Sequence, residues 1–280
     1  MCSRRFFIWI LKNANELLTL CEEQNISISE VMRNREIITR ECPAKEADQK
    51  MARVLEIMKE AARSPIEKPI RSMGGLIGGE AQKLAQHSAS GQGLCGELLE
   101  KAITYAMATL ETNASMGLIV ASPTAGSAGI VPGLLLAFQE VYHFSDKEIQ
   151  QVLFNAGAVG YLAMRNATVA GAVGGCQAEV GVASAMAASA AVELMGGTPK
   201  QCLDAASTVL MNMLGLVCDP VGGLVEYPCQ NRNAAGVANA LIASLKCPLP
   251  AFLSSFLLMK CSRQCTKSES DFRLNCVRQH

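Results

Sequence analysis

Apolar residues recur at helical spacing through residues 12–63, with polar residues between them. The positions that share a face are Leu17, Leu18 and Cys21 in one run and Met51, Val54, Leu55 and Met58 in a later one. This spacing is typical of amphipathic helices. Ser27 and Glu30 have the Ser-x-x-Glu spacing of a capping box that starts a helix. The pattern predicts supporting helices with solvated outer faces, away from any chemistry.

Beyond residue 98 the helical pattern is built from small residues. Predicted helices cover 98–120, 133 onward, 146–164, the run from Cys176 to Gly196, 199–216 and 233–246. A helix that is small and apolar on every side has to be buried against other helices. Because alternating β patterns are almost absent, the predicted fold class is mostly α. We expect a single bundle-like domain of small-residue-rich helices, with Gly/Pro-rich loops carrying the cysteines.

Proline positions and a change of composition predict three segments. Pro65 and Pro69 bound a predicted linker, so residues 1–69 form an N-terminal helical segment that packs on the core. Residues 70–248 form the main domain. Residues 249–280 are rich in Ser, Lys, Arg and Cys and lack helical periodicity, which predicts a disordered tail.

The composition is half hydrophobic, with only 5% aromatic residues and zero formal net charge. A neutral chain without a basic stripe argues against nucleic acid as a partner. The apolar stretches 114–138 and 156–192 raise the alternative of a small-residue helical membrane or scaffold protein with structural cysteines. Pro and Gly interrupt both stretches, and the second contains Arg165 and Glu179. Such residues are unfavourable in hydrocarbon, so we expect no membrane association.

Three of the twelve cysteines stand among glycines and prolines. Cys176 follows two glycines, and two glycines and two prolines separate Cys218 from Cys229, so loops are predicted for all three. Their long intervals match no zinc pattern, which needs pairs about two to four residues apart. Three converging thiolates suit an iron–sulfur cluster with one open iron. The alternative is that they are buried apolar cysteines.

Two further Gly-rich segments suggest binding of anions. The first, SMGGLIGGEAQKL at 72–84, has the composition of an anion-binding nest, although a plain turn before a helix is the favoured interpretation. The second, ASPTAGSAGIVPG at 121–133, offers the hydroxyls of Ser122, Thr124 and Ser127 beside flexible backbone. Such a turn suits a small carboxylate, because several donors converge without a charge.

Several motifs together resemble a known family. They are TAGSAGIVPG at 124–133, the run from Arg165 through NATVAGAVGGCQAEVGVASAMA, and LVCDPVGG followed by PCQNRNA. In this order they resemble the α chain, or α domain, of the iron–sulfur L-serine dehydratases, over roughly residues 70–248. The resemblance implies a lyase of amino-acid catabolism and gluconeogenesis that deaminates L-serine to pyruvate and ammonia. The tail departs from the family, whose chains continue into further helices.

The resemblance also implies a cofactor and its site. A [4Fe-4S] cluster would act as a Lewis acid on the substrate hydroxyl, with Cys176, Cys218 and Cys229 as its ligands. The residues implied to bind substrate or support the site are Thr124, Ser127, Arg165, Asn166, Arg232 and Asn233. A cluster-dependent dehydratase of another small hydroxy acid is the alternative, because serine itself rests on the resemblance.

The catalytic base is not identified by the sequence. The chain has only three histidines, none of them beside the cysteines, while Glu179 and Glu226 are candidates with equally plausible structural roles. No lysine stands in the Gly-rich setting of a Schiff base, so pyridoxal phosphate is not expected. The resemblance implies that a β subunit supplies the base in a heteromer. Cysteine usage and the absence of a secretory signal favour a cytoplasmic location.

Overall fold

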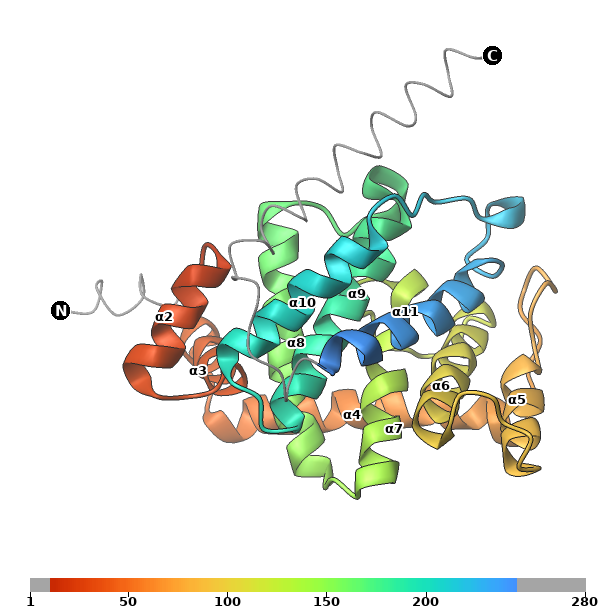
Figure 1. The fold of residues 1–280 in the computed structure, drawn as a ribbon, viewed down its shortest axis with the longest axis horizontal. Helices are drawn as coiled ribbons and strands as arrows, with labels where there is room; N and C mark the ends of the chain where they lie inside the picture. Colours follow the sequence, from red (N-terminus) through yellow and green to blue (C-terminus); the bar gives the residue numbers. More distant parts are fainter. Residues whose placement is uncertain (1–10, 246–280) are drawn as a thin grey trace, which may run out of the picture.

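The computed structural model describes residues 11–245, so the prediction of a disordered tail at 249–280 lies outside the described residues. Within this part the regular secondary structure is entirely helical, which confirms the mostly α class. The helices are α2 (Ala14–Gln24), α3 (Ile28–Arg40), α4 (Ala44–Glu67), α5 (Glu80–Ala89), α6 (Glu97–Ala114), η1 (Ala125–Ser127), α7 (Ile130–Tyr142), α8 (Asp146–Asn166), α9 (Gly171–Leu194), α10 (Pro199–Met213), η2 (Val221–Gly223) and α11 (Cys229–Ser244). Figure 1 shows their arrangement.

Helix starts follow local sequence signals. Ser27 accepts a hydrogen bond from the Glu30 backbone and receives the reciprocal contact, which confirms the predicted capping box of α3. Ser145 and Glu148 make the same arrangement at α8, and Thr198 with Gln201 at α10. A cap of this kind contributes about 1 kcal/mol, because it satisfies backbone N–H groups that have no partner inside the helix.

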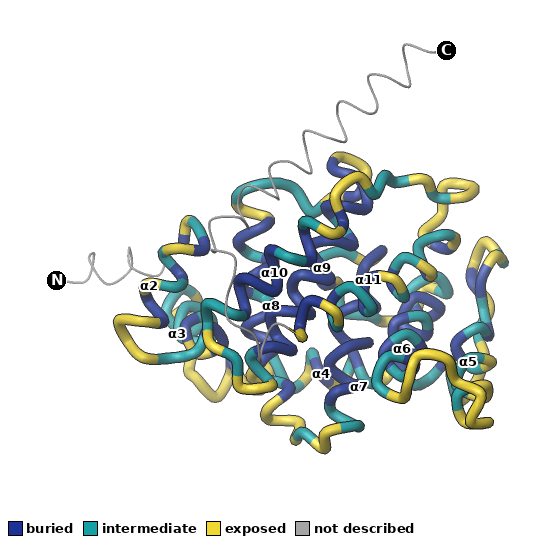
Figure 2. Tube along the Cα trace, in the orientation of Figure 1, coloured by how far each residue is buried: buried dark blue, intermediate teal, exposed yellow. Residues whose placement is uncertain are grey.

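Helix α9 lies at the centre of the bundle, packed against α7, α8, α10 and α11 (Figure 1). Its residues from Val180 to Val192 are all buried, as the small-residue pattern predicts (Figure 2). Glycines allow similarly close contacts elsewhere. A Cβ at Gly133 of α7 would stand 2.8 Å from the Ala102 carbonyl oxygen of α6. Small residues therefore let helix backbones approach each other with few voids.

The predicted linker at Pro65–Pro69 is wrong in its first half, because α4 continues through Pro65 to Glu67. A proline inside a helix leaves the carbonyl four residues earlier without its donor. Here that carbonyl belongs to Ala61, and it accepts a hydrogen bond of 2.8 Å from Thr112 Oγ1 of α6. A tertiary contact therefore satisfies the carbonyl and lets the helix continue.

Two predicted helix starts are also too late in the sequence. Helix α7 begins at Ile130 rather than Gly133, and α11 begins at Cys229 rather than Asn233.

The N-terminal helices share one hydrophobic core with α6 to α11, through Leu17, Ile28 and Leu55 among others. Among the helices in residues 11–245, none combines the length and the apolar character that crossing a membrane would require.

Candidate functional site

The three cysteines of the Gly/Pro-rich segments lie at a break, in a loop and at a helix start. Cys218 lies in the cysteine loop, which we define as residues 214–228 between α10 and α11, and this confirms its predicted position. Cys176 directly follows Gly175, which interrupts the helical backbone of α9 with φ 73° and ψ 177°. This φ favours glycine. Cys229 is the first residue of α11 and Cys176 lies within the bounds of α9, so the loop prediction is wrong for both.

Arg232 of α11 connects the cysteine segments. Its Nη1 donates to Cys176 Sγ at 3.0 Å and to the Val217 carbonyl at 2.9 Å. The guanidinium also forms an ion pair with Asp219, and the Arg232 side chain is only 14% exposed. Because Val217 and Asp219 flank Cys218, one planar cation fixes the loop around Cys218 beside the Cys176 sulfur.

Gln177 attaches the same loop to α9. Its backbone N–H donates to the Leu216 carbonyl at 2.7 Å, and the Gly215 N–H donates to Gln177 Oε1 at 2.9 Å. Gln177 is 1% exposed, whereas Gly215 is exposed, so a buried residue of α9 holds a surface loop. Buried contacts of this kind are retained because a lone buried amide is strongly disfavoured. The segment before Cys218 is therefore held along two adjacent residues.

The charges around the thiols place all three cysteines within electrostatic reach of one another. Burial raises the pKa of Cys176 to about 12 and that of Cys229 to about 11. The neighbouring Cys218 and the Glu179 carboxylate raise both pKa values further, while the Arg232 cation opposes them. Cys176 and Cys229 are therefore protonated thiols in the metal-free chain, and binding of a metal would release their protons.

This donor set fits a cluster better than a single ion. The structure has free thiols at all three positions. Between residues 11 and 245, no three His, Cys, Asp or Glu side chains are close enough together to hold one metal ion. In an iron–sulfur cluster each cysteine binds a different iron, so its thiols need not meet at one point. The electrostatic coupling of Cys176 and Cys229 to Cys218, and the contact of Arg232 with Cys176, are compatible with that arrangement.

The hydroxyl turn, which we define as residues 122–129, lies against the same residues. Thr124 Oγ1 is 3.1 Å from Ser127 Oγ and donates to the Glu179 carboxylate of α9. A Cβ at Gly126 would stand 2.7 Å from Glu179 Oε1. This position therefore requires glycine for the carboxylate and the turn to approach so closely.

Asn233 holds the hydroxyl turn from the α11 side. Its Oδ1 accepts from the Gly129 N–H at 3.1 Å, and its Nδ2 donates to the Gly126 carbonyl at 2.8 Å. Asn233 and Ser127 are both 0% exposed. Both ends of the Asn233 amide are thus occupied by the backbone, so this residue positions the turn. The structure brings Thr124, Ser127, Arg232 and Asn233 together around Glu179 and the cysteines.

Arg165 and Asn166 make their contacts elsewhere. Asn166 Nδ2 donates to the Lys12 carbonyl at 3.0 Å and to the Leu162 carbonyl at 2.8 Å. Arg165 is exposed and its Nη1 lies 3.3 Å from the Tyr161 hydroxyl. Asn166 therefore attaches the end of α8 to the N-terminal segment, and Arg165 contacts its own helix, so neither contact involves the cysteines.

The Gly-rich loop, which we define as residues 72–79, does bind a carboxylate, and it belongs to the chain itself. Glu226 of the cysteine loop accepts hydrogen bonds from Ser72 Oγ at 2.6 Å, Gly74 N–H at 2.6 Å and Leu76 N–H at 2.9 Å. Glu226 is 2% exposed. Burial acts to raise its pKa, but the hydrogen bonds from Ser72 and the backbone prevail and lower it. Glu226 is therefore an ionised structural anchor.

The paired glycines of the Gly-rich loop were the sequence signal for an anion-binding turn. Nothing in the sequence indicated that the anion would be the carboxylate of Glu226. The partners are more than a hundred residues apart. The favoured interpretation of a plain turn is wrong, because the loop wraps a charge. Ser72 is the functional residue that the sequence did not single out.

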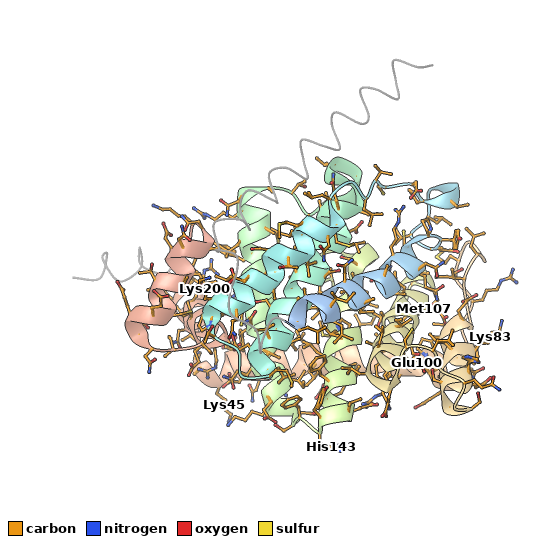
Figure 3. The ribbon with its side chains drawn as sticks, in the orientation of Figure 1. Lys45, Lys83, Glu100, Met107, His143 and Lys200 are labelled. Carbon is orange, nitrogen blue, oxygen red and sulfur yellow. The ribbon has the colours of Figure 1, made fainter. Side chains whose placement is uncertain are left out.

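The histidines in the described chain lie away from the cysteines. His143 is at the turn between α7 and α8, on the opposite side of the molecule from the cysteine loop (Figure 3). His87 is in the last turn of α5, whereas the Gly-rich loop adjoins the first turn of that helix. The third, His280, lies outside the described residues. No histidine in residues 11–245 is therefore available at the cysteines as a base.

The fold and the site together define a helical protein that gathers three thiols, a cation and a hydroxyl-rich turn at one end of its buried central helix. A family model described as "Serine dehydratase alpha chain" matches residues 23–247. The chain belongs to this family.

Some similar proteins are named as α chains, and others are longer chains that this sequence covers only in part. A "Probable L-serine dehydratase, alpha chain" of Bacillus subtilis is 47% identical, covering 84% of this chain and 78% of the relative. The "L-serine dehydratase, alpha chain" of Peptoniphilus asaccharolyticus is 43% identical over 84% of this chain and 80% of its own. The "L-serine dehydratase TdcG" of Escherichia coli is 34% identical over 83% of this chain, but that match spans only 52% of the relative.

Proposed function

We propose that this chain is the cluster-binding part of an L-serine dehydratase, a lyase that converts L-serine to pyruvate and ammonia in amino-acid catabolism. The observation that carries the proposal is the contact of Arg232 with Cys176 Sγ and with both residues that flank Cys218. Arg232 thereby joins Cys176 of α9 to the backbone on both sides of Cys218, and Cys229 lies on the same helix as Arg232. The names of the relatives support serine as the substrate.

Cys176, Cys218 and Cys229 would hold a [4Fe-4S] cluster, and Arg232 and Asn233 would fix the backbone around it. When bound, such a cluster supplies a Lewis acid for the leaving hydroxyl. Arg232 would also balance part of the negative charge that three thiolates bring into a partly buried site. No pyridoxal phosphate is needed in this scheme.

The hydroxyl turn is the proposed binding site for the substrate carboxylate. Thr124 offers a half-buried hydroxyl at the start of η1, and this hydroxyl would turn from Glu179 to donate to the substrate carboxylate. Ser127 is buried behind it and orients the Thr124 hydroxyl through their contact. Before substrate binds, Glu179 of α9 accepts a hydrogen bond from the same hydroxyl and so holds the turn against that helix. Arg165 and Asn166 remain weaker candidates, since Asn166 contacts the N-terminal segment and Arg165 contacts Tyr161 of its own helix.

We further propose that a β chain completes the site. TdcG and the other relatives of about that length extend far beyond the region matched here. Large apolar side chains are also exposed on the segments that surround the cysteines. They are Met73, Leu76, Val173, Leu214, Val221, Leu224, Val225 and Tyr227. Exposed apolar side chains gathered on neighbouring segments favour a protein contact. A β chain bound there would lie close to the cysteines and would supply the missing base.

The test is anaerobic purification of the chain with its partner, followed by iron and sulfide analysis and assays of L-serine, L-threonine and malate. Cys218→Ala is expected to lose the visible absorption, most of the iron and the serine turnover together. Cys42→Ala is the control, because Cys42 is half-buried like Cys218 but lies between α3 and α4. A Cys218→Ala protein with full iron content would show that the ligand assignment is wrong.

Each outcome of the assays bears on one part of the proposal. Turnover of malate without turnover of serine would favour the hydroxy-acid alternative. Full serine turnover by the iron-loaded chain alone would refute the need for a β chain. An iron-free, active protein would refute the cluster itself.

A further inference from the structure

Two glutamates meet behind the Gly-rich loop, where α5, α6 and α11 converge. Glu111 of α6 is 0% exposed, and its Oε1 accepts from the Ala81 N–H at 2.9 Å and from Gln230 Nε2 at 3.1 Å. Its Oε2 is buried and receives no hydrogen bond from any N–H group or hydroxyl. The carboxylate of Glu80, at the first position of α5, is its remaining partner.

Two ionised carboxylates in contact would repel each other strongly. At a separation of about 4 Å the repulsion is of the order of 4 kcal/mol near a protein surface, and more inside it. A single proton between the two oxygens removes the repulsion and gives the unpartnered Oε2 a hydrogen bond. The orphaned, buried oxygen is thus explained by a proton that two carboxylates share.

The surroundings decide which glutamate carries the proton. Burial raises the pKa of Glu111. Burial acts in the same direction on Glu80, but the N–H groups at the start of α5, including Gly78 N–H at 2.6 Å, prevail and lower its pKa. The N-terminus of a helix also favours a negative charge. Glu80 is therefore the ionised partner and Glu111 the protonated one.

The helices around α6 bring no cation to this pair. Among the described residues, no ion pair includes Glu80 or Glu111. On α4 the cations Lys59 and Arg63 pair with Asp146 and Glu140, and Glu179 of α9 is engaged by Thr124. From α11 the facing group is the neutral amide of Gln230. Hence only a proton is available, among the described residues, to neutralise the second carboxylate.

We propose that Glu111 carries a proton at neutral pH and donates it to Glu80, and that this pair positions the start of α11, with Cys229, against the Gly-rich loop. Gln230 follows Cys229 directly and bonds to Glu111, so the pair acts through Gln230. The link to Cys229 rests on the proposed function, whereas the shared proton does not. Glu111 is thus a positioning residue.

Infrared spectroscopy of the full chain at neutral pH tests the proton directly. The wild-type spectrum is expected to show the carbonyl stretch of a protonated carboxyl group, shifted in D2O, and Glu111→Gln is expected to lack it. Glu97→Gln is the matched control, because Glu97 is an exposed glutamate of the same helix, and it should keep the band. A wild-type spectrum without the band, or a band that survives in Glu111→Gln, would overturn the proposal.

Thermal unfolding against pH provides an independent readout. A pKa raised in the folded state gives stability that is complete below the ordinary value of 4.5 and is lost as the pH rises through the raised value. The wild-type midpoint should therefore fall, by about 3 °C or more, on the alkaline side. Glu111→Gln should remove this loss, because its amide donates to Glu80 at every pH. An unchanged alkaline limb in the variant would contradict the proposal.

Iron retention separates this inference from the proposed function. Glu111→Ala is expected to lose iron relative to wild type, while Glu111→Gln retains it. If wild type itself bound no iron, the proposed function would fail while the infrared band remained. Should Glu111→Gln not fold, Glu80→Gln tests the shared proton instead, because the proton of Glu111 then meets an amide rather than a carboxylate and the carbonyl band is expected to shift; an unshifted band would contradict the proposal.

Discussion

Charged side chains in the N-terminal helices and around the cysteine loop differ in where their partners lie. Arg33 of α3 and Asp48 of α4 form a bidentate pair at 2.6 and 2.7 Å, with side chains 31% and 50% exposed. Glu226 and Arg232 instead contact backbone groups and a thiol inside the protein, on segments distant in the sequence. Water solvates the charges of the first region, whereas protein groups do most of the solvation of Glu226 and Arg232, which are 2% and 14% exposed.

The difference shows which charges hold this protein together. An exposed pair exchanges water for a partner at little net gain. A buried charge, in contrast, depends on every donor or acceptor around it, because losing one leaves an unsatisfied group. The loops around the cysteines have few large apolar side chains in the core, so buried charges take over the ordering that Leu and Ile provide in α2 to α4.

The largest effect is expected from Glu226→Ala. Removing the carboxylate leaves Ser72 and two backbone N–H groups of the Gly-rich loop without their acceptor, so the free energy of unfolding should fall by about 3 kcal/mol. Urea denaturation monitored by circular dichroism measures the change. An unaltered midpoint would contradict the view that Glu226 anchors the loop.

The pH dependence of the same residue gives a sharper version of this test. The pKa of Glu226 is lowered from its ordinary value of 4.5, so its contribution is present above that value and lost as the pH falls through the lowered one. Glu226→Gln should therefore flatten the acid side of the stability profile while leaving the neutral side lower. Parallel acid limbs in the two proteins would show that another carboxylate is responsible.

Arg232→Ala is expected to have the next largest effect on stability. The change removes contacts to Cys176, to the Val217 carbonyl and to Asp219, which should lower the free energy of unfolding by about 2 kcal/mol. Arg232→Lys should recover only part of it, because an ammonium does not reproduce the planar fork. If the lysine variant is as stable as wild type, the geometry of the guanidinium is unimportant.

The smallest effect is expected at the exposed pair. Arg33→Ala should change the free energy of unfolding by only about 0.5 kcal/mol, and the change should shrink further at high salt. Denaturation at low and high ionic strength measures both. A loss as large as that of Arg232→Ala would remove the contrast between the two regions.

Local sequence was sufficient for most of the architecture. The capping boxes at Ser27 and Ser145 and the small-residue run of α9 depend on neighbours a few residues away, so their structure follows from spacing alone. The Gly/Pro setting of Cys218 likewise predicted its loop, while the role of the three cysteines as a site stays a prediction. Pro65 shows the limit of such reasoning, since the donor that lets α4 continue comes from Thr112 on another helix.

The sequence by itself determined that this chain is a helical protein with cysteines beside helix-breaking glycines and prolines, because helix periodicity and glycine conformation are local properties. Tertiary structure alone decided that Arg232 reaches Cys176, that the Gly-rich loop binds Glu226, and that Glu80 meets Glu111. These pairs join residues far apart along the chain, and no local pattern specifies which distant partner a buried charge will have. Only the packing of α5, α6, α9 and α11 brings them within contact.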